Sequence, residues 1–354
     1  MPHITLIFED GRSIGLQASS EETIYAAALR NKLRLESDCL EGACATCKGL
    51  CSSGEYRLGD YSEDALSDEE AAARQVLTCQ MRASSDCVIE LPYASTQALG
   101  KAGVPVQRLA MPVTGLETVA EGVVRLTLGA VEQGVAAMQF LPGQYVHLQV
   151  PGSEAQRSYS FSNAPALAEV SATGSSLTEA GSMEFYIKLL PSGVMSDYLR
   201  QRAAVGDRIH VSGPFGRFYL RPPQRPILMV AGGTGLAPML SMLRSLLAQQ
   251  RAQQQALPPI HLLYGAASSA EFCDGNSLQD LMDQGLPLTV QRIAVGDSPG
   301  QGHVTSLLRP ELLHANGSDV YLCGPPPMIE AAQSWLRAQG VPATQVYAEK
   351  FLPS

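Results

Sequence analysis

Four cysteines in a fixed spacing constrain this chain more than any other feature of its sequence. Cys39, Cys44 and Cys47 stand in a C-x4-C-x2-C arrangement. Cys79 follows 32 residues after the third of them. Gly42 and the neighbouring alanines allow backbone amides to close around a small inorganic core and to point at its sulfurs. Because four thiolates at this spacing are the ligands of a 2Fe–2S cluster, the pattern predicts such a cluster and one-electron transfer.

A structural zinc site is the alternative for the same thiols. Zinc usually takes two separated pairs of Cys or His ligands, whereas here three thiols are grouped and one is distant. Disulfides are not expected, because nothing in the sequence suggests export. Cys51 could be a spare ligand, although a small buried thiol is the more common role of such a residue. Cys87 and Cys273 are expected to be structural.

Length and hydropathy set the number of domains and the environment that we expect. A chain of 354 residues is too long for one compact core, which indicates two or three domains. No segment is long and apolar enough to span a membrane. The N-terminus begins with a strand-like alternation at Ile4, Leu6 and Phe8, which predicts neither signal peptide nor anchor. We therefore expect a soluble, cytoplasmic protein with no membrane partner.

The negative charge is concentrated in the N-terminal segment. Residues up to Ser95 include 16 acidic and 8 basic side chains, a net charge of −8 within the total of −9. The densest part runs from Asp60 to Glu70. A solvated loop or helix face is its ordinary interpretation, and a docking patch for a basic protein is the alternative. An acidic surface of this kind predicts that nucleic acid is not a partner.

The first segment, residues 1–95, shows a distinctive order of elements around the cysteines. Asp10-Gly11 is a hairpin signal between two alternating strands. A helix is expected to start after Ser19, with Glu22 three residues later as in a capping box. Hairpin, helix and cysteine loop in this order resemble a plant-type ferredoxin. The resemblance implies a β-grasp domain that holds the 2Fe–2S cluster.

Strand patterns dominate the middle of the chain. Residues 96–106, with little periodicity, predict an interdomain linker. Over residues 107–222, short strands such as 123–128 and 184–189 are separated by Pro-Gly and Gly-rich turns, which predicts a small antiparallel β-barrel. Residues 164–182, rich in Ala, Ser, Thr and Gly, are expected to form a variable loop of this barrel.

Strands and helices alternate in the last segment, residues 223–354. An apolar strand pattern from Ile227 to Val230 precedes a helix from Pro238 to Gln250, and a second strand follows at residues 260–264. This alternation predicts a doubly wound parallel sheet. The expected fold class is therefore a multidomain chain of α+β and α/β type.

Two short motifs in the barrel segment have the chemistry to bind a phosphorylated cofactor with a flat ring. One is Arg157-Ser158-Tyr159-Ser160 and the other is Gly193-Val194-Met195-Ser196. An arginine beside hydroxyl groups can hold a diphosphate, and a tyrosine can stack on a ring. A glycine-led turn into a helix offers free backbone amides to phosphate. Either motif alone is more often an ordinary surface strand with polar residues.

Together, the two motifs resemble those of the ferredoxin–NADP reductase superfamily, R-x-Y-S followed by G-x-x-S/T. The resemblance implies that Arg157 and Ser196 hold the diphosphate of FAD. It implies that Tyr159 lies along the flavin and that Ser160 hydrogen-bonds near its reactive N5 atom. One further strand lines the flavin with main-chain groups in this superfamily, and here it carries Tyr186, Ile187 and Lys188.

A glycine-rich loop in the last segment predicts a dinucleotide site. It follows a predicted buried strand, precedes a helix and consists of Gly232, Gly233, Thr234 and Gly235. Glycines allow a pyrophosphate to approach the backbone, and Pro238 suits the first turn of the helix. The loop departs from the standard G-x-G-x-x-G fingerprint, because a proline stands at the third glycine.

The same resemblance implies two further parts of the site. Cys323, Gly324 and Pro325 follow another predicted strand and would form the second half of the nicotinamide pocket. Cys323 would approach the ring during hydride transfer, which makes it a catalytic residue together with Ser160; without the resemblance it is a buried thiol. Some members cover the flavin with an aromatic residue near the C-terminus, and Phe351 is placed to do so.

The order of the three segments resembles the reductase components of benzoate, toluate and anthranilate 1,2-dioxygenases. The resemblance implies an enzyme that takes an electron pair from NADH onto FAD and passes single electrons through the cluster to a separate terminal oxygenase. NADH rather than NADPH is expected, because no lysine or arginine occurs between Arg251 and Arg292 to bind a 2′-phosphate. Glu271 and Asp274 would repel that phosphate if they faced it, although either can be a solvated loop residue.

Other functions remain open at this point. The chain is not expected to be the oxygenase, because its six histidines are scattered and form neither a Rieske motif nor a two-histidine iron site. A reductase for a diiron monooxygenase acting on phenol, toluene or methane can have the same three-domain order. A passive electron carrier with a vestigial flavin site is a more distant alternative. An absorption spectrum separates the last alternative, because FAD adds visible bands that a bare ferredoxin lacks.

Overall fold

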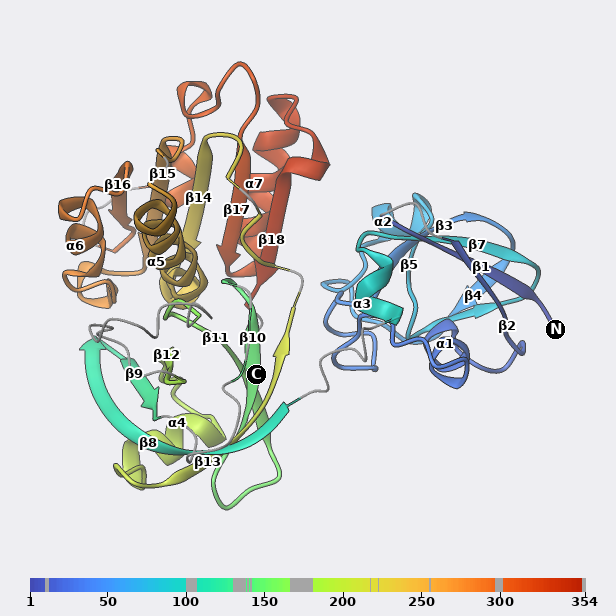
Figure 1. The fold of residues 1–354 in the computed structure, drawn as a ribbon, viewed down its shortest axis with the longest axis horizontal. Helices are drawn as coiled ribbons and strands as arrows, with labels where there is room; N and C mark the ends of the chain where they lie inside the picture. Colours follow the sequence, from blue (N-terminus) through green and yellow to red (C-terminus); the bar gives the residue numbers. More distant parts are fainter. Residues whose placement is uncertain are drawn as a thin grey trace. The chain divides into compact units, whose positions relative to one another are not determined.

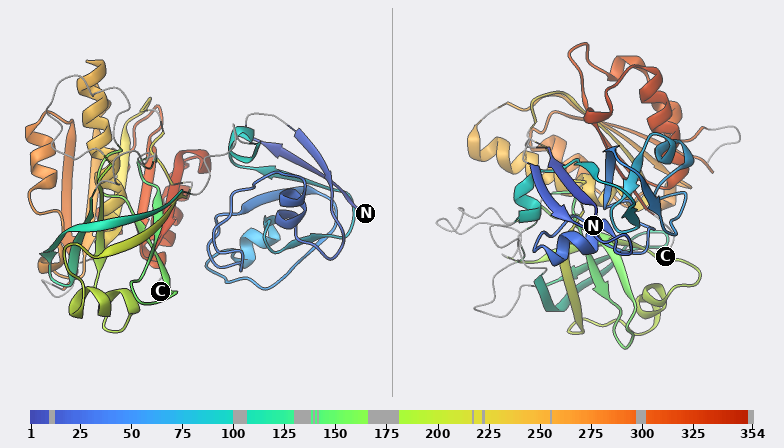
Figure 2. Two further views of the ribbon diagram at one scale, coloured as in Figure 1. Left: turned by 60° about the horizontal axis from the view of Figure 1, so that its bottom comes forward. Right: turned by 90° about the vertical axis from the view of Figure 1, so that its right-hand side faces the viewer.

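The computed structural model describes most of the chain as two compact units, Met1–Val106 and Gln107–Ser354 (Figures 1 and 2). The described residues are 1–9, 13–99, 107–129, 138, 140, 142–165, 181–216, 218–221, 223–254, 256–296 and 302–351. The hairpin signal at Asp10-Gly11 and most of the loop expected at 164–182 lie outside them. None of the helices in the described part of the chain has the length and apolar character that crossing a bilayer requires.

The first unit is a mixed sheet of five strands in the order β2-β1-β7-β3-β5, with a two-stranded sheet β4-β6 beside it. β1 pairs antiparallel with β2 and parallel with β7, as a β-grasp fold requires. Its strands are β1 (His3–Phe8), β2 (Ser13–Gln17), β3 (Lys48–Ser53), β4 (Tyr56–Leu58), β5 (Gln75–Leu77), β6 (Met81–Ala83) and β7 (Cys87–Leu91). Its helices are α1 (Ile24–Arg30), α2 (Asp68–Ala72) and α3 (Ser95–Leu99).

Helix α1 covers this sheet and begins later than the sequence predicts. Ser19 and Glu22 do bond reciprocally, with 3.2 Å from the Glu22 amide to Ser19 Oγ and 2.7 Å from the Ser19 amide to Glu22 Oε1. The helix nevertheless begins at Ile24, because the hydroxyl of Thr23 accepts the Ala26 amide and acts as the N-cap. The expected start after Ser19 is therefore wrong by one turn.

Helix α3 occupies the first residues of the range for which the sequence predicts a linker. Ala98 is 3% exposed and belongs to the core of the first unit. Its carbonyl accepts a hydrogen bond from the Arg34 amide at 3.0 Å. Ala98 is thus packed on the first unit, and residues 100–106 lie outside the described chain.

The second unit begins with an antiparallel barrel of six strands in the order β11-β10-β13-β8-β9-β12. A bridge between Phe161 and Phe185 joins the two ends of this order and closes the barrel, as the sequence predicts. Phe161 and Phe185 are both fully buried in its core. Its elements are β8 (Gln107–Ala120), β9 (Val123–Leu128), β10 (Tyr145–Gln149), β11 (Gln156–Ser160), β12 (Met183–Lys188), β13 (Arg208–Phe215) and α4 (Val194–Gln201).

A parallel sheet in the order β16-β15-β14-β17-β18 completes the second unit. Helices cover both of its faces, α5 and α6 on one and α7 on the other (Figure 1). The elements are β14 (Ile227–Gly232), β15 (Ile260–Ala266), β16 (Leu288–Ala294), β17 (Asp319–Gly324), β18 (Val346–Lys350), α5 (Leu236–Gln253), α6 (Ser277–Asp283) and α7 (Pro326–Ala338). Short 3₁₀ turns join them: η1 (Gly233–Gly235), η2 (Ser269–Glu271), η3 (Val304–Leu307), η4 (Pro310–Leu312) and η5 (Ala343–Gln345).

The central strand β14 explains why its sequence reads as an unbroken apolar run. Met229 and Ala231 enter the core beneath α5 and α6, whereas Leu228 and Val230 enter the core beneath α7. A strand with helices on both faces buries every side chain, which is the pattern of a doubly wound sheet. The predicted α/β fold of this segment is confirmed.

Candidate functional site: thiols, flavin strand and nicotinamide loops

The four cysteines of the motif lie as two pairs of thiols. Cys47 and Cys79 are 2% and 4% exposed, and their sulfurs are 3.2 Å apart. Cys39 and Cys44 are half-buried, and the Cys39 amide donates to Cys44 Sγ at 3.5 Å. In the described residues, no three Cys, His, Asp or Glu side chains are grouped as ligands of a single metal ion. Two pairs of thiols suit a two-iron cluster, in which each iron takes two thiolates.

Backbone amides of the cysteine loop point at the sulfur of Cys39. The amides of Glu41 and Ala43 donate to Cys39 Sγ at 3.4 and 3.3 Å. Hydrogen bonds from the Cys44 thiol and from these amides lower the pKa of Cys39 to about 5, against the opposing effect of burial. The two backbone amides directed at this sulfur fit the predicted cluster, because such amides hydrogen-bond ligand thiolates.

The loop holds this shape by a close approach to the segment after β4. Gly42 has φ of 78°, and a Cβ there would lie 2.6 Å from the Asp60 carbonyl oxygen. Only glycine tolerates both conditions. The side chain of Gln80, next to Cys79, donates to the Leu40 carbonyl at 3.2 Å and ties the two halves of the site together. Sequence reasoning missed Gln80, because a lone glutamine carries no motif.

Cys51 lies in different surroundings from the four. It is fully buried in the core beneath α1 rather than in the cluster of Cys47 and Cys79. The guanidinium of Arg74 lies 3.5 Å from its sulfur and donates to its carbonyl at 2.8 Å. These contacts support the structural interpretation of Cys51.

The predicted flavin residues lie on three elements of the barrel. Arg157 and Tyr159 are half-buried on β11, and Ser160 ends that strand at 5% exposure. The Arg157 guanidinium donates to the Gln156 carbonyl at 2.8 Å, and no carboxylate of the described chain forms a salt bridge with it. Tyr159, Ile187 and Met195 contact one core, which also includes Phe161. Burial raises the pKa of Tyr159, so its hydroxyl stays protonated.

Helix α4 leaves its first amides without a side-chain cap. Gly193 is its N-cap and offers no side chain, while Ser196 bonds the Leu190 amide at 3.0 Å instead. Free amides at a helix N-terminus bind phosphate groups. Together with an arginine that forms no salt bridge with a carboxylate of the described residues, this arrangement fits a diphosphate.

The two predicted nicotinamide segments lie side by side at the carboxyl ends of neighbouring strands. β14 ends at Gly232 and β17 at Gly324, and Ala231 pairs with Cys323. A Cβ on Gly235 would lie 2.3 Å from the Cys323 carbonyl oxygen, so only glycine fits this contact. Gly233, Thr234 and Gly235 form the turn η1, and Pro325 is the N-cap of α7. Ligands of such sheets bind at this edge.

Cys323 and Phe351 both lie at the carboxyl end of β17. Cys323 belongs to the buried strand itself, and Phe351 follows β18. Cys323 is fully buried, and burial raises the pKa of its thiol, which therefore stays neutral. The Phe351 amide donates to the Gly324 carbonyl at 2.9 Å, and its half-buried side chain packs on the core beneath α5. The structure thus brings the C-terminal aromatic residue to the loop after β17.

The acidic residues after β15 are already paired. Asp274 is 4% exposed and forms a salt bridge with Arg292. Glu271 forms one with Lys188 of the barrel at 2.7 Å. The expectation that these carboxylates are solvated, or free to repel a phosphate, is therefore corrected. Asp274 neutralises the arginine of β16 that stands beside Tyr264 of β15.

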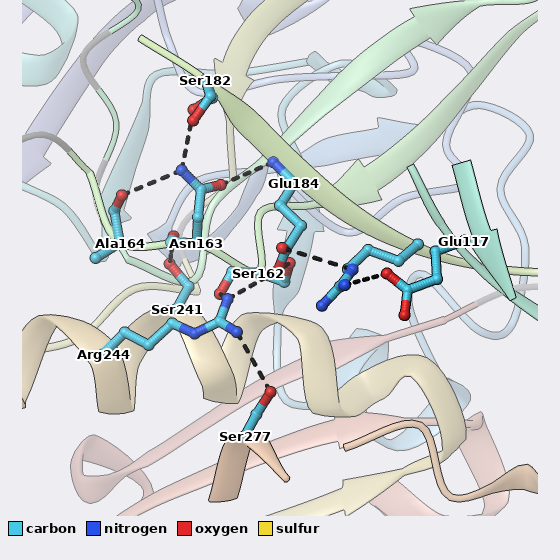
Figure 3. Close-up of polar contacts among 10 residues, drawn as sticks. Glu117, Ser162, Asn163, Ala164, Ser182, Glu184, Ser241, Arg244 and Ser277 are labelled. Carbon is cyan, nitrogen blue, oxygen red and sulfur yellow. Dashed lines mark hydrogen bonds and ion pairs between the residues drawn. The ribbon is translucent and has the colours of Figure 1, made fainter. Parts of the chain in front are cut away.

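A polar network joins the barrel to helix α5, and sequence reasoning missed it (Figure 3). Arg244 forms a salt bridge with Glu184 at 2.8 Å and donates to the Ser162 carbonyl at 2.9 Å. Ser241 donates to the Asn163 carbonyl at 2.7 Å. Such residues carry no local motif, because each partner stands 60 or more positions away in the sequence.

Comparison with known proteins matches three domain families in the order of the three segments. A 2Fe-2S iron-sulfur cluster binding domain matches residues 7–84. An oxidoreductase FAD-binding domain matches residues 110–219, and an oxidoreductase NAD-binding domain matches residues 229–334. The chain is therefore an oxidoreductase with 2Fe–2S, FAD and NAD sites. The zinc alternative for the thiols is not supported.

Relatives extend over the whole chain. The toluate 1,2-dioxygenase electron transfer component of Pseudomonas putida is 40% identical, with 98% of this chain and 97% of the relative covered. The anthranilate 1,2-dioxygenase electron transfer component of Acinetobacter baylyi is 37% identical, with 99% and 97% covered. The propane 2-monooxygenase reductase component of Rhodococcus jostii is 34% identical, with 96% and 89% covered. The chain belongs to the family of oxygenase electron transfer components that contains these proteins.

Solved structures agree with the fold. The crystal structure of a cytochrome P450 reductase from Amycolatopsis is similar with a TM-score of 0.69 and 29% identity, covering 99% of both chains. The ferredoxin reductase of carbazole 1,9a-dioxygenase has a TM-score of 0.64 at 24% identity, covering 99% of this chain and 98% of that chain. The resemblance predicted from the cysteine, flavin and nicotinamide motifs is confirmed.

Proposed function

We propose that this protein passes electrons from NADH, through FAD and the 2Fe–2S cluster, to the terminal oxygenase of an aromatic ring-hydroxylating dioxygenase of the benzoate, toluate or anthranilate type. The observation that carries the proposal is identity of 37–40% along nearly the whole chain to three dioxygenase electron transfer components. Bound FAD supplies the conversion of an electron pair into single electrons, which no side chain can perform.

Residues of the first unit would hold the cluster. We assign Cys39, Cys44, Cys47 and Cys79 as its ligands, supported by their two pairs and by the amides directed at Cys39. Amide hydrogen bonds to cluster sulfurs are one determinant of the reduction potential.

Residues of the barrel would hold FAD. Arg157 and the amides of Val194 to Ser196 would bind the diphosphate, supported by the helix start without a side-chain cap and by a guanidinium with no salt bridge among the described residues. Tyr159 would lie along the isoalloxazine, and Ser160 would donate to its N5. Ser158 and Gly193 flank these groups, and the main chain of Tyr186, Ile187 and Lys188 would line the ring.

The parallel sheet would hold the dinucleotide. The turn Gly232 to Gly235 would accept the pyrophosphate at the N-terminus of α5, which has no side-chain cap. Gly324 and Pro325 would form the facing wall, and Cys323 would approach the nicotinamide as a neutral thiol. Phe351 would cover the flavin until the nicotinamide displaces it, supported by its bond to Gly324.

NADH is proposed as the preferred dinucleotide, and the cytoplasm as the compartment. The salt bridge of Arg292 with Asp274 supports the preference, because it removes a cation that could bind a 2′-phosphate. None of the eight cysteines forms a disulfide bond, which supports a reducing compartment.

Reconstitution with purified oxygenases tests the proposed partner. NADH-driven product formation is expected with a terminal oxygenase of toluate or anthranilate dioxygenase type, in proportion to added reductase. A monooxygenase hydroxylase is the second candidate, because the propane 2-monooxygenase reductase component of Rhodococcus jostii is 34% identical over 96% of this chain. Turnover with the monooxygenase alone would reject the dioxygenase assignment in favour of the second candidate.

A further inference from the structure

Strand β12 faces two ways, and each face contacts a different half of the second unit. Phe185 and Ile187 point into the barrel core. The alternating residues Glu184, Tyr186 and Lys188 instead contact the half that carries the parallel sheet. Because side chains alternate along a strand, one short strand fixes both the barrel wall and the position of the neighbouring half.

The salt bridge between Glu184 and Arg244 is partly buried and has a further hydrogen bond beside it. Their side chains are 19% and 26% exposed, and the salt bridge is 2.8 Å long. Ser162 donates its hydroxyl to the same Glu184 oxygen at 2.7 Å. Burial alone would raise the pKa of Glu184, but Arg244, Ser162 and Arg125 together lower it. Glu184 is therefore ionised at neutral pH and has partners on both sides of the junction.

Asn163 fastens the main chain on the barrel side of this junction. Its side-chain Nδ2 donates a hydrogen bond to the Ser182 carbonyl at 3.0 Å, and its side-chain Oδ1 accepts one from the Glu184 backbone amide at 2.9 Å (Figure 3). Its own carbonyl accepts from Ser241 of α5. Asn163 and Ser162 are 6% and 0% exposed, so water does not compete for these bonds.

The network connects the two ends of the proposed hydride path. On one side, Ser162 stands two residues after Ser160, which is assigned to the flavin N5. On the other, Arg244 and Ser241 belong to the helix that starts at the glycine turn assigned to the dinucleotide. A helix and a strand are both stiff elements, so a shift at Arg244 moves the glycine turn relative to the flavin strand.

We propose that Glu184 and Arg244 are positioning residues that hold the nicotinamide in register with the flavin for hydride transfer. The inference rests on the proposed function and on its site assignments. Neither residue touches the reacting atoms in this assignment. Their effect is on alignment, and a displacement of about 1 Å at the reacting atoms can cost on the order of a hundredfold in rate.

Anaerobic stopped-flow reduction of FAD by NADH tests the pair in the full-length holoprotein. We expect Arg244→Met and Glu184→Gln each to lower the limiting reduction rate by about tenfold to a hundredfold. FAD content and the NADH concentration at half-saturation should change little. Arg244→Lys should recover part of the rate, and the double variant should lose no more than either single variant, because both act through one contact.

Arg251→Met is the matched control. Arg251 lies on the same helix, and its guanidinium bonds Gln284 within the parallel-sheet half at 2.8 Å. The limiting rate of FAD reduction by NADH in Arg251→Met should equal that of the wild type. If Arg244→Met does not fold, Glu184→Gln decides the question, since it keeps the shape of the side chain and removes only its charge.

Two results would overturn the inference. One is wild-type limiting rates in the folded, FAD-loaded Glu184→Gln variant. The other is a loss of activity fully explained by loss of FAD, which indicates a purely structural role. A wild-type protein whose FAD is not reduced by NADH would instead reject the proposed function, independently of any variant.

Discussion

At the scale of residues, the cluster site depends on groups that lie within one loop and one distant strand end. The Cys39 sulfur receives amide hydrogen bonds from its own loop, so its environment follows from local spacing. Cys79 reaches the site only through the fold, in contact with Cys47. The assignment of Cys79 as the fourth ligand therefore depends on the fold, whereas the environment of Cys39 depends on its own loop.

Exchange of Cys79 tests this choice. Cys79→Ser should remove or strongly perturb the visible and EPR signals of the cluster. NADH-to-dye activity should persist, because the FAD and NAD sites belong to the second compact unit. Cys51→Ser is the control and should keep a normal cluster, since Cys51 packs in a separate core. The reverse pattern would show that Cys51 is the ligand.

A second prediction at the scale of residues concerns the affinity of the protein for FAD. Arg157→Ala should weaken FAD binding by about tenfold to a hundredfold, because a charge-assisted bond to phosphate in a partly buried site contributes about 1.5–3 kcal/mol. Equilibrium dialysis or fluorescence of released FAD measures the change. Arg200→Ala on α4, whose guanidinium is 3.8 Å from Asp197, is a matched control. Equal affinity in wild type and Arg157→Ala would contradict the assignment.

The sequence predicts the motif-bearing residues but not the contacts between them. C-x4-C-x2-C, R-x-Y-S and the glycine loop are local patterns, so their chemistry can be read without a structure. Glu184 and Arg244 stand 60 positions apart, and each alone reads as an ordinary charged surface residue. The contact of Gln80 with Leu40 and the salt bridge of Asp274 with Arg292 likewise join residues that are separated in sequence and carry no local motif.

At the scale of elements, strand and helix types follow from apolar periodicity, but their pairing does not. The apolar run of β14 indicates a strand buried on both faces, and the structure has helices there. The order β11-β10-β13-β8-β9-β12 joins strands distant in sequence, and no local pattern encodes it. The start of α1 depends on which of two neighbouring hydroxyls caps it, a choice that Thr23 settles.

The junction of β12 with α5 should make stability depend on pH. The folded-state pKa of Glu184 lies below the ordinary value of 4.5, so ionised Glu184 stabilises the fold above that pH, and this contribution is lost as the pH falls through the lowered pKa. Arg244 on α5 and Arg125 on β9 face the carboxylate, with Glu117 of β8 bonded to Arg125. The melting temperature of wild type should exceed that of Glu184→Gln at neutral pH, with the difference shrinking in acid. A difference independent of pH would contradict this.

The loop after β15 underlies the prediction that the enzyme prefers NADH to NADPH. kcat/KM with an artificial acceptor should be much larger for NADH than for NADPH. Asp274→Asn should raise relative activity with NADPH, because it frees the Arg292 guanidinium for a phosphate. Steady-state kinetics with both dinucleotides measures the ratio. Equal or better wild-type kcat/KM with NADPH would reject the preference.

At the scale of the whole molecule, two compact units divide the chemistry. The four thiols assigned to the cluster lie in Met1–Val106, and the proposed flavin and nicotinamide sites share Gln107–Ser354. Within the second unit, the barrel and the parallel sheet have a common core that includes Val123 and Tyr186 of the barrel. This division agrees with a chain in which the electron pair is accepted and split within one unit, and the other unit carries single electrons only.

The central claim is that electrons from NADH reach the cluster only through FAD. Anaerobic EPR after addition of NADH tests it most directly, in wild type and in Arg157→Ala depleted of FAD. We expect the signal of a reduced 2Fe–2S cluster in the wild type and none in the depleted variant, with dithionite producing the signal in both. An NADH-reduced cluster without FAD, or an unreduced cluster in the FAD-loaded wild type, would contradict the proposed path.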